Sequence, residues 1–288
     1  MSELLVPFQY DYMLKAMWVS GLVGATCAFL SAFLMLKGWS LMGDALAHSI
    51  VPGVAGAYLL GIPFAAGAFV AGFLAAIAMW FVRQQSNLRE DAVIGIVFSS
   101  FFAAGLLLVS INPTAVNVQS IVLGNILGIS DADALQVVVI AAVSLTVLTA
   151  KWKDLMLVFF DETQARAAGM SPMALKLLFF TLLSASTVAA LQTVGACLVI
   201  AMVVTPGATA YLLADRFDRL LILSITIGAM TSVVGAYVSY FLDGATGGVI
   251  VVLQTLLFLA AFVFAPKHGL LAARRNAAAA EASTEGSA

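Results

Sequence analysis

Long runs of apolar residues, separated by short polar stretches, cover almost the whole chain. A run of about 20 such residues can cross a hydrocarbon layer about 30 Å thick as a helix. The sequence therefore predicts an all-α polytopic membrane protein with about nine transmembrane helices. These predicted spans are 13–36, 41–60, 62–82, 90–110, 133–150, 173–190, 194–213, 220–241 and 248–265.

Three segments do not fit this pattern of spans. The run 117–128, NVQSIVLGNILG, is apolar but too short to cross the membrane, so we expect a re-entrant or interfacial helix there. Residues 1–12 form a short external segment before the transmembrane domain at 13–266. The tail 267–288 is rich in alanine and small polar residues without apolar periodicity, which predicts disorder in the cytoplasm.

Composition supports the assignment to the membrane. Of the 288 residues, 62% are hydrophobic and only 10% are charged, whereas soluble domains carry about 25% charged residues. Cys27 and Cys197 lie in separate apolar runs with no CxxC motif, so we interpret both as small buried hydrophobic residues. A disulfide framework and a thiolate metal site are not indicated.

The distribution of basic residues predicts the orientation in the membrane. Lysine and arginine concentrate in the cytoplasmic loops of membrane proteins. If the amino terminus is outside, only Lys15 remains on the external side, and the carboxyl terminus is cytoplasmic. The residues then placed in the cytoplasm are Lys37, Arg83, Arg89, Lys151, Lys153, Arg166, Lys176, Arg216, Arg219, Lys267, Arg274 and Arg275.

Asp44 and His48 are the main candidates for chemistry. Of the fifteen carboxylates, only Asp44 lies well inside a predicted span, where a charge costs about 2.5–3.5 kcal/mol on insertion scales. His48 follows four residues later, so both side chains share one helix face. A carboxylate beside an imidazole can bind manganese, iron or zinc. Two other interpretations stay open, a hydrogen-bonded pair between helices and a proton relay.

One such pair is too small for a closed metal site. Zinc takes about four ligands and manganese about six, so a second copy across a dimer axis would complete the set. An imidazole must be neutral to bind metal, and we therefore expect acid to weaken binding.

The loop 160–172, FDETQARAAGMSP, predicts a short surface helix. Asp161 can cap its first turn, Gly169 can end it, and Pro172 can begin the next helix. Two other prolines, Pro52 and Pro206, lie within apolar runs of small residues, and we expect them to break helices near a pathway. A simple packing kink is the alternative at both prolines.

Two motifs are absent from the sequence. There is no GxxxxGKS/T, so the chain has no P-loop for ATP, and no HExxH, which argues against an intramembrane zinc protease.

The ordered segments LKGWSLMGDALAHSIVPGVA, EDAVIGIVFSS, DETQARAAGMSP, MVVTPGATAYLLA and APKHGLL resemble the permeases of bacterial ABC importers for manganese, zinc and iron. The resemblance covers nearly the whole chain, and GDALAHSIVPGVA is its most specific part. It implies that Asp44 and His48 coordinate the transported metal. It also implies that a coupling helix around Asp161, Glu162, Ala165 and Gly169 docks on a cytoplasmic ATP-binding subunit.

The same resemblance implies the rest of the assembly. Two permease subunits would pair in the bacterial cytoplasmic (inner) membrane, and an external solute-binding protein would deliver the metal. The chain would bind no permanent cofactor and no nucleic acid, and ATP hydrolysis would belong to the partner subunit. A stand-alone secondary cation transporter or channel is the alternative function, and a membrane scaffold is a third. The residues leave open which metal is preferred and whether the permeases are identical.

Overall fold

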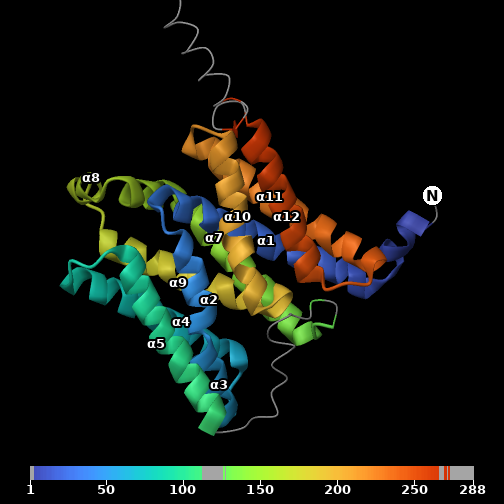
Figure 1. Cartoon of the computed structure of the whole chain (residues 1–288), viewed down its shortest axis with the longest axis horizontal. Coiled ribbons are helices and arrows are strands. Elements are labelled where there is room, and N and C mark those ends of the chain that lie inside the picture. Colours follow the sequence, from blue (N-terminus) through green and yellow to red (C-terminus); the bar gives the residue numbers. More distant parts are fainter. Residues whose placement is uncertain (1–2, 112–125, 127, 266–268, 271, 273–288) are drawn as a thin grey trace, which may run out of the picture.

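The computed structural model describes residues 3–111, 126, 128–265, 269–270 and 272, and all regular elements among them are helices. Figure 1 shows them packed into one bundle, with the amino terminus and α8 toward opposite ends. The elements are η1 (Glu3–Gln9), α1 (Asp11–Lys37), α2 (Ser40–Ser49), α3 (Val51–Leu60), α4 (Phe64–Gln85), α5 (Glu90–Ile111), α7 (Asp131–Phe160), α8 (Glu162–Ala167), α9 (Pro172–Val194), α10 (Ala196–Leu213), α11 (Phe217–Leu242) and α12 (Thr246–Phe264).

In the described part of the chain, seven helices are long and apolar enough to cross a membrane. They are α1, α4, α5, α7, α9, α11 and α12. The other two predicted spans differ from this type. For α10 (Ala196–Leu213) the fully described part is the apolar stretch Leu198–Leu213, and the run 41–60 forms two helices of ten residues each, α2 and α3. The multi-pass helical architecture is therefore confirmed, but nine separate full-length spans are not.

Pro52 explains the division of the run 41–60. Proline has no N–H to donate and its ring clashes with the carbonyl group four residues earlier, so it is tolerated in the first turn of a helix, where Pro52 lies in α3. The turn at Ile50 separates α2 from α3, and each helix is about 15 Å long, half of a membrane. At Pro206 the expectation of a break was wrong, because α10 continues through that residue.

The first half of the core forms around α1. This helix is mostly buried and packs against α10, α11, α7 and α9. Its contact with α11 is close because both helices present glycine. A Cβ added to Gly24 would lie 2.5 Å from the carbonyl oxygen of Gly228. Such close backbone approach at small residues is typical of helix packing in membranes.

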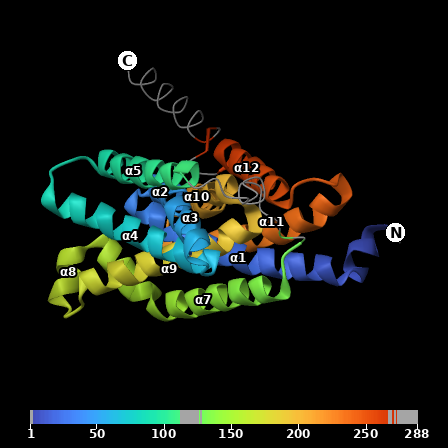
Figure 2. The same cartoon turned by 90° about the horizontal axis from the view of Figure 1, so that it is seen from below.

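The second half of the core consists of α3, α4 and α5, which pack on one another. Between the two halves lies α2, in contact with α5 and α4 on one side and with α10 and α9 on the other. Figure 2 shows α2 and α10 between α5 and the pair α7 and α9. The helix that carries Asp44 and His48 therefore occupies the centre of the molecule.

The span predicted at 133–150 was too short at its carboxyl end. α7 continues to Phe160, because no proline or glycine interrupts it and Leu155, Val158 and Phe159 remain buried. The extra ten residues add about 15 Å and bring the chain directly to α8.

Basic residues lie near this end of the bundle, which we name the α8 end. Lys37 donates a hydrogen bond from Nζ to the carbonyl oxygen of Phe159 (3.3 Å). Lys15 is paired with Asp131 near the start of α1 and α7, at the opposite end. Which end faces the cytoplasm stays a prediction. The helix expected at 117–128 and the tail 267–288 lie almost entirely outside the described residues.

Candidate metal-binding site

The sequence places Asp44 and His48 on the open face of a buried helix. α2 begins after Gly38, whose left-handed backbone (φ 74°) turns the chain away from α1. Most of its side chains are buried, including Met42, Ala45, Leu46 and Ala47. Along α2 the more accessible side chains are Leu41, Asp44 and His48, which share one face.

The two polar side chains lie against each other. His48 Nε2 is 3.3 Å from Asp44 Oδ1, and the side chains are 26% and 37% exposed, respectively. The contact does not have hydrogen-bond geometry, and among the described residues Oδ1 of Asp44 is buried without a hydrogen-bond partner. A buried carboxylate oxygen in this position is costly unless something binds it. A lone pair of the Asp44 Oδ1 oxygen is therefore available beside the imidazole of His48.

Two aromatic rings from α5 flank the histidine. The imidazole ring of His48 lies 5.5 Å from the ring of Phe98 and 5.7 Å from the ring of Phe102, centre to centre. These rings limit the positions that the imidazole can take. Neither phenylalanine was identified from sequence. Their spacing of four residues gives them a common helix face, but no local pattern connects that face with His48.

A third contribution from α5 is Gly105, next to the end of α2. A Cβ on Gly105 would lie 2.8 Å from the backbone nitrogen of Pro52 and 2.7 Å from a methyl carbon of Val51. Only glycine allows α5 to approach the break between α2 and α3 so closely. The close approach sets the distance between α5 and the start of α3, directly after α2.

One chain provides only part of a metal coordination shell. Within the described ranges, no group of three or more histidine, cysteine, aspartate or glutamate residues could hold a metal ion. Asp44 and His48 could offer two ligands, fewer than the four to six that zinc or manganese prefers.

The second predicted site lies at α8. The side chain of Asp161 accepts hydrogen bonds from the backbone N–H groups of Thr163 (2.9 Å) and Gln164 (3.0 Å), and so caps the helix. Ala165 is fully buried, and Gly169 ends the turn with φ 79°. The short helix expected within 160–172 is present, with the cap and the stop that the sequence indicates.

Glu162 connects α8 to α9. Its carboxylate accepts hydrogen bonds from Lys176 Nζ (2.5 Å) and from Arg166 (2.9 Å). The hydrogen bond from Lys176 lowers the pKa of the Glu162 carboxyl below its ordinary value, although partial desolvation opposes this shift. Sequence reasoning placed Glu162 at α8 but did not identify its partner on α9.

Comparison with known proteins identifies the family. The sequence profile described as "ABC 3 transport family" matches residues 9–265. The chain belongs to this family. It is 72% identical over 275 residues to the chelated iron transport system membrane protein YfeC of Yersinia pestis, covering 95% of this chain and 94% of that protein. It is also 48% identical to the manganese transport system membrane protein MntB of Synechocystis, covering 93% and 88% of the two chains.

A solved structure agrees with this membership. The chain superimposes on PsaBC from Streptococcus pneumoniae in complex with Fab with a TM-score of 0.83 and 36% identity, covering 93% of this chain and 97% of that chain. The resemblance to metal permeases seen in the sequence is confirmed. As a member of the ABC 3 transport family, the chain is a multi-pass membrane protein of a transport system.

Proposed function

We propose that this protein is the permease subunit of an ATP-driven importer of a divalent transition metal: manganese, iron or zinc. The observation that carries the proposal is the pairing of Asp44 with His48 on the open face of α2, with one carboxylate oxygen unsatisfied. Carboxylate and imidazole ligands suit these metals. Iron and manganese in the names of two close relatives support the same substrate class.

In this proposal the metal is cargo, held for a short time on its way through the membrane. Asp44 supplies a negatively charged oxygen, and His48 supplies a neutral ring nitrogen. A second permease subunit, identical or related, supplies an equivalent pair across a dimer axis. Because the shell is shared between subunits, separation of the two α2 helices weakens it and releases the metal.

The energy comes from outside this chain. α8, the helix marked by Asp161, Glu162, Ala165 and Gly169, docks on a cytoplasmic ATP-binding subunit through its exposed face, while the buried Ala165 holds it on the bundle. An external solute-binding protein supplies the metal. The α8 end then faces the cytoplasm, in agreement with the positive-inside rule. A short, capped helix joined to the bundle by an ion pair is suited to transmit such a contact. The assembly lies in the bacterial cytoplasmic membrane.

Reconstitution tests the proposal. The chain is placed in liposomes with its ATP-binding subunit and its solute-binding protein, and uptake of labelled manganese, iron(II) and zinc is measured. We expect uptake only when ATP is hydrolysed. Equal uptake by the chain alone, driven by an ion gradient, would identify a secondary transporter and overturn the proposal.

A further inference from the structure

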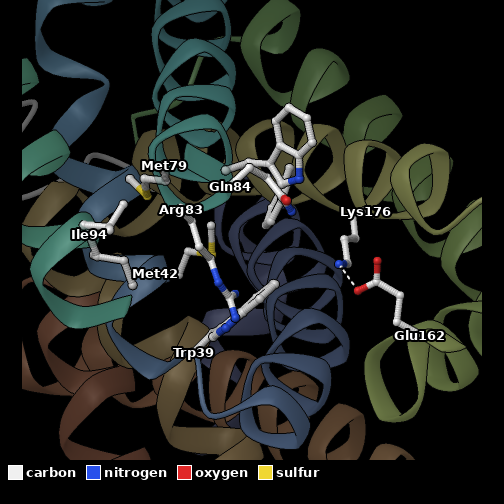
Figure 3. A pocket seen from close by; sticks show the side chains of 11 residues that line it. Trp39, Met42, Met79, Arg83, Gln84, Ile94, Glu162 and Lys176 are labelled. Carbon is white, nitrogen blue, oxygen red and sulfur yellow. Dashed lines mark hydrogen bonds and ion pairs between the residues drawn. The ribbon is translucent and has the colours of Figure 1, made fainter. Parts of the chain in front are cut away.

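The start of α2 is fixed by one buried aromatic residue, Trp39. Its side chain is 6% exposed. The indole packs edge-on against Phe159 of α7, with ring centres 5.4 Å apart, and stacks on Phe180 of α9 at 5.7 Å. The guanidinium of Arg83 lies over the same indole, 5.6 Å from the ring centre, as Figure 3 shows. Trp39 therefore joins α2 to α7, α9 and α4.

The same neighbours hold α8. Phe159 comes two residues before Asp161, the residue that caps α8. Phe180 lies one helical turn after Lys176, whose ammonium group is paired with Glu162 of α8. Because α8 and the start of α2 rest on the same two segments, a displacement of α8 also acts on Trp39.

At its carboxyl end, α2 does not continue into α3 as one regular helix. α2 ends at Ser49, and Pro52 prevents regular helical hydrogen bonding across the junction with α3. Between its anchor and this break, α2 is a rigid piece of ten residues. Asp44 and His48 lie five and nine residues after Trp39, about 7.5 and 13.5 Å along the helix. Rotation at the break would therefore move both ligands.

A cavity beside the anchor gives α2 room to move. Its volume is about 130 Å³, and its walls come from α2, α4, α5, α8 and α9 (Figure 3). Protein interiors are normally close-packed, which prevents such movements. The lining residues are Trp39, Met42, Met79, Trp80, Arg83, Gln84, Val93, Ile94, Glu162, Lys176 and Phe180.

We propose that α2 is a lever between α8 and the metal ligands, with Trp39 as the positioning residue that couples them. The inference rests on the proposed transport function and adds how the ATP-dependent movement reaches the metal. Displacement of α8 shifts Phe159 and Phe180, Trp39 moves into or out of the cavity, and α2 turns about the break at Pro52. Asp44 and His48 then change their distance from the partner pair.

The test uses the reconstituted complex and measures metal taken up per ATP hydrolysed. Trp39→Ala is expected to lower this ratio about tenfold, within the range for residues that couple two sites, while ATP hydrolysis continues. Metal affinity of the detergent-solubilised permease should not change. Trp39→Phe keeps a ring for stacking and should restore most of the ratio. Trp18→Ala is the matched control, because Trp18 is 78% exposed on α1.

A second variant tests the cavity without altering the anchor. Ile94→Trp fills the space beside Trp39 and should also lower the uptake ratio, whereas Ile96→Trp, at a position 56% exposed on the same helix, should not. Thermal unfolding in detergent verifies that each variant is folded. Normal uptake per ATP in folded Trp39→Ala and Ile94→Trp would overturn the lever. Absence of ATP-dependent uptake by the unchanged protein would instead overturn the proposed function, and the lever with it.

Discussion

The hydroxyl of Ser31 on α1 is inserted into the backbone of α10 beside Gly207. Ser31 Oγ accepts a hydrogen bond from the Gly207 N–H (3.0 Å) and donates one to the carbonyl oxygen of Val204 (3.1 Å). Pro206, between these two residues, has no N–H of its own. In a membrane, a neighbouring serine can satisfy the backbone groups that a proline disturbs. This contact joins α1 to the part of α10 that contains Pro206, where the helix continues without a break.

Ser31→Ala should therefore destabilise the bundle. The substitution removes two hydrogen bonds between α1 and α10, and each such bond contributes about 0.5–1.5 kcal/mol. The free energy of unfolding in detergent measures the effect. Ser100→Ala is the control, because Ser100 is exposed and its hydroxyl bonds only within its own helix. Equal stability of the two variants would contradict the role of Ser31.

The contact between α3 and α4 gives a second stability prediction. A Cβ on Gly67 would lie 2.2 Å from the carbonyl oxygen of Gly53, so Gly67→Ala forces two backbones apart. We expect a loss of about 1–3 kcal/mol, as for other overpacked positions. Gly56→Ala is the matched control on α3, since a Cβ there would meet no described atom within 4 Å. The control should be neutral or up to about 1 kcal/mol more stable.

Removal of either candidate ligand should abolish transport. Asp44→Asn keeps the shape of the side chain without its charge, and His48→Ala removes the ring nitrogen. We expect uptake to fall at least about 100-fold, since even residues that only support metal ligands commonly contribute 10- to 100-fold. The amount of protein in the membrane should stay the same. Leu41→Ala alters the same face of α2 without removing a ligand and should transport normally. Normal uptake by either ligand variant would refute the site.

Glu162 gives a prediction for pH. Its pKa in the folded protein lies below the ordinary value of 4.5, chiefly because it accepts a hydrogen bond from Lys176. The ion pair therefore stabilises the docking of α8 fully above pH 4.5 and is lost as pH falls below that value toward the folded pKa. Hydrogen exchange of the amides of α8, corrected for the intrinsic effect of pH, measures the docking.

Lys176→Met is the control for this pH effect. Without the ammonium group, the carboxyl of Glu162 loses its main stabilising partner, and α8 should exchange faster already at neutral pH. If the amides of α8 in the unchanged protein lost their protection against hydrogen exchange between pH 7 and 6, a group other than Glu162 would control the docking of α8.

Local chemistry can be read from neighbouring residues in the sequence. Asp44 and His48 share a face because a helix repeats every 3.6 residues, and their rarity in an apolar run indicates a functional pair. Asp161 and Gly169 likewise mark the two ends of α8, because capping depends on a few adjacent residues. The break at Pro52 follows in the same way from the missing N–H.

The sequence could not show which segments meet. Pro206 carries the same local signal as Pro52, yet α10 continues through it, and Ser31, 175 residues earlier in the chain, contacts α10 there. Boundaries were uncertain for the same reason, since α7 is extended by burial of Phe159 against other helices.

The sequence by itself determined the class of protein, the pairing of Asp44 with His48 on one helix face and the capped helix, because these depend on apolar length and on residues within two turns of one another. Only the tertiary structure decided that Trp39 joins Phe159, Phe180 and Arg83, and that a cavity remains beside it. Those contacts connect residues far apart in the chain. They arise from the packing of helices, for which the sequence pattern gives the buried faces but not the partners.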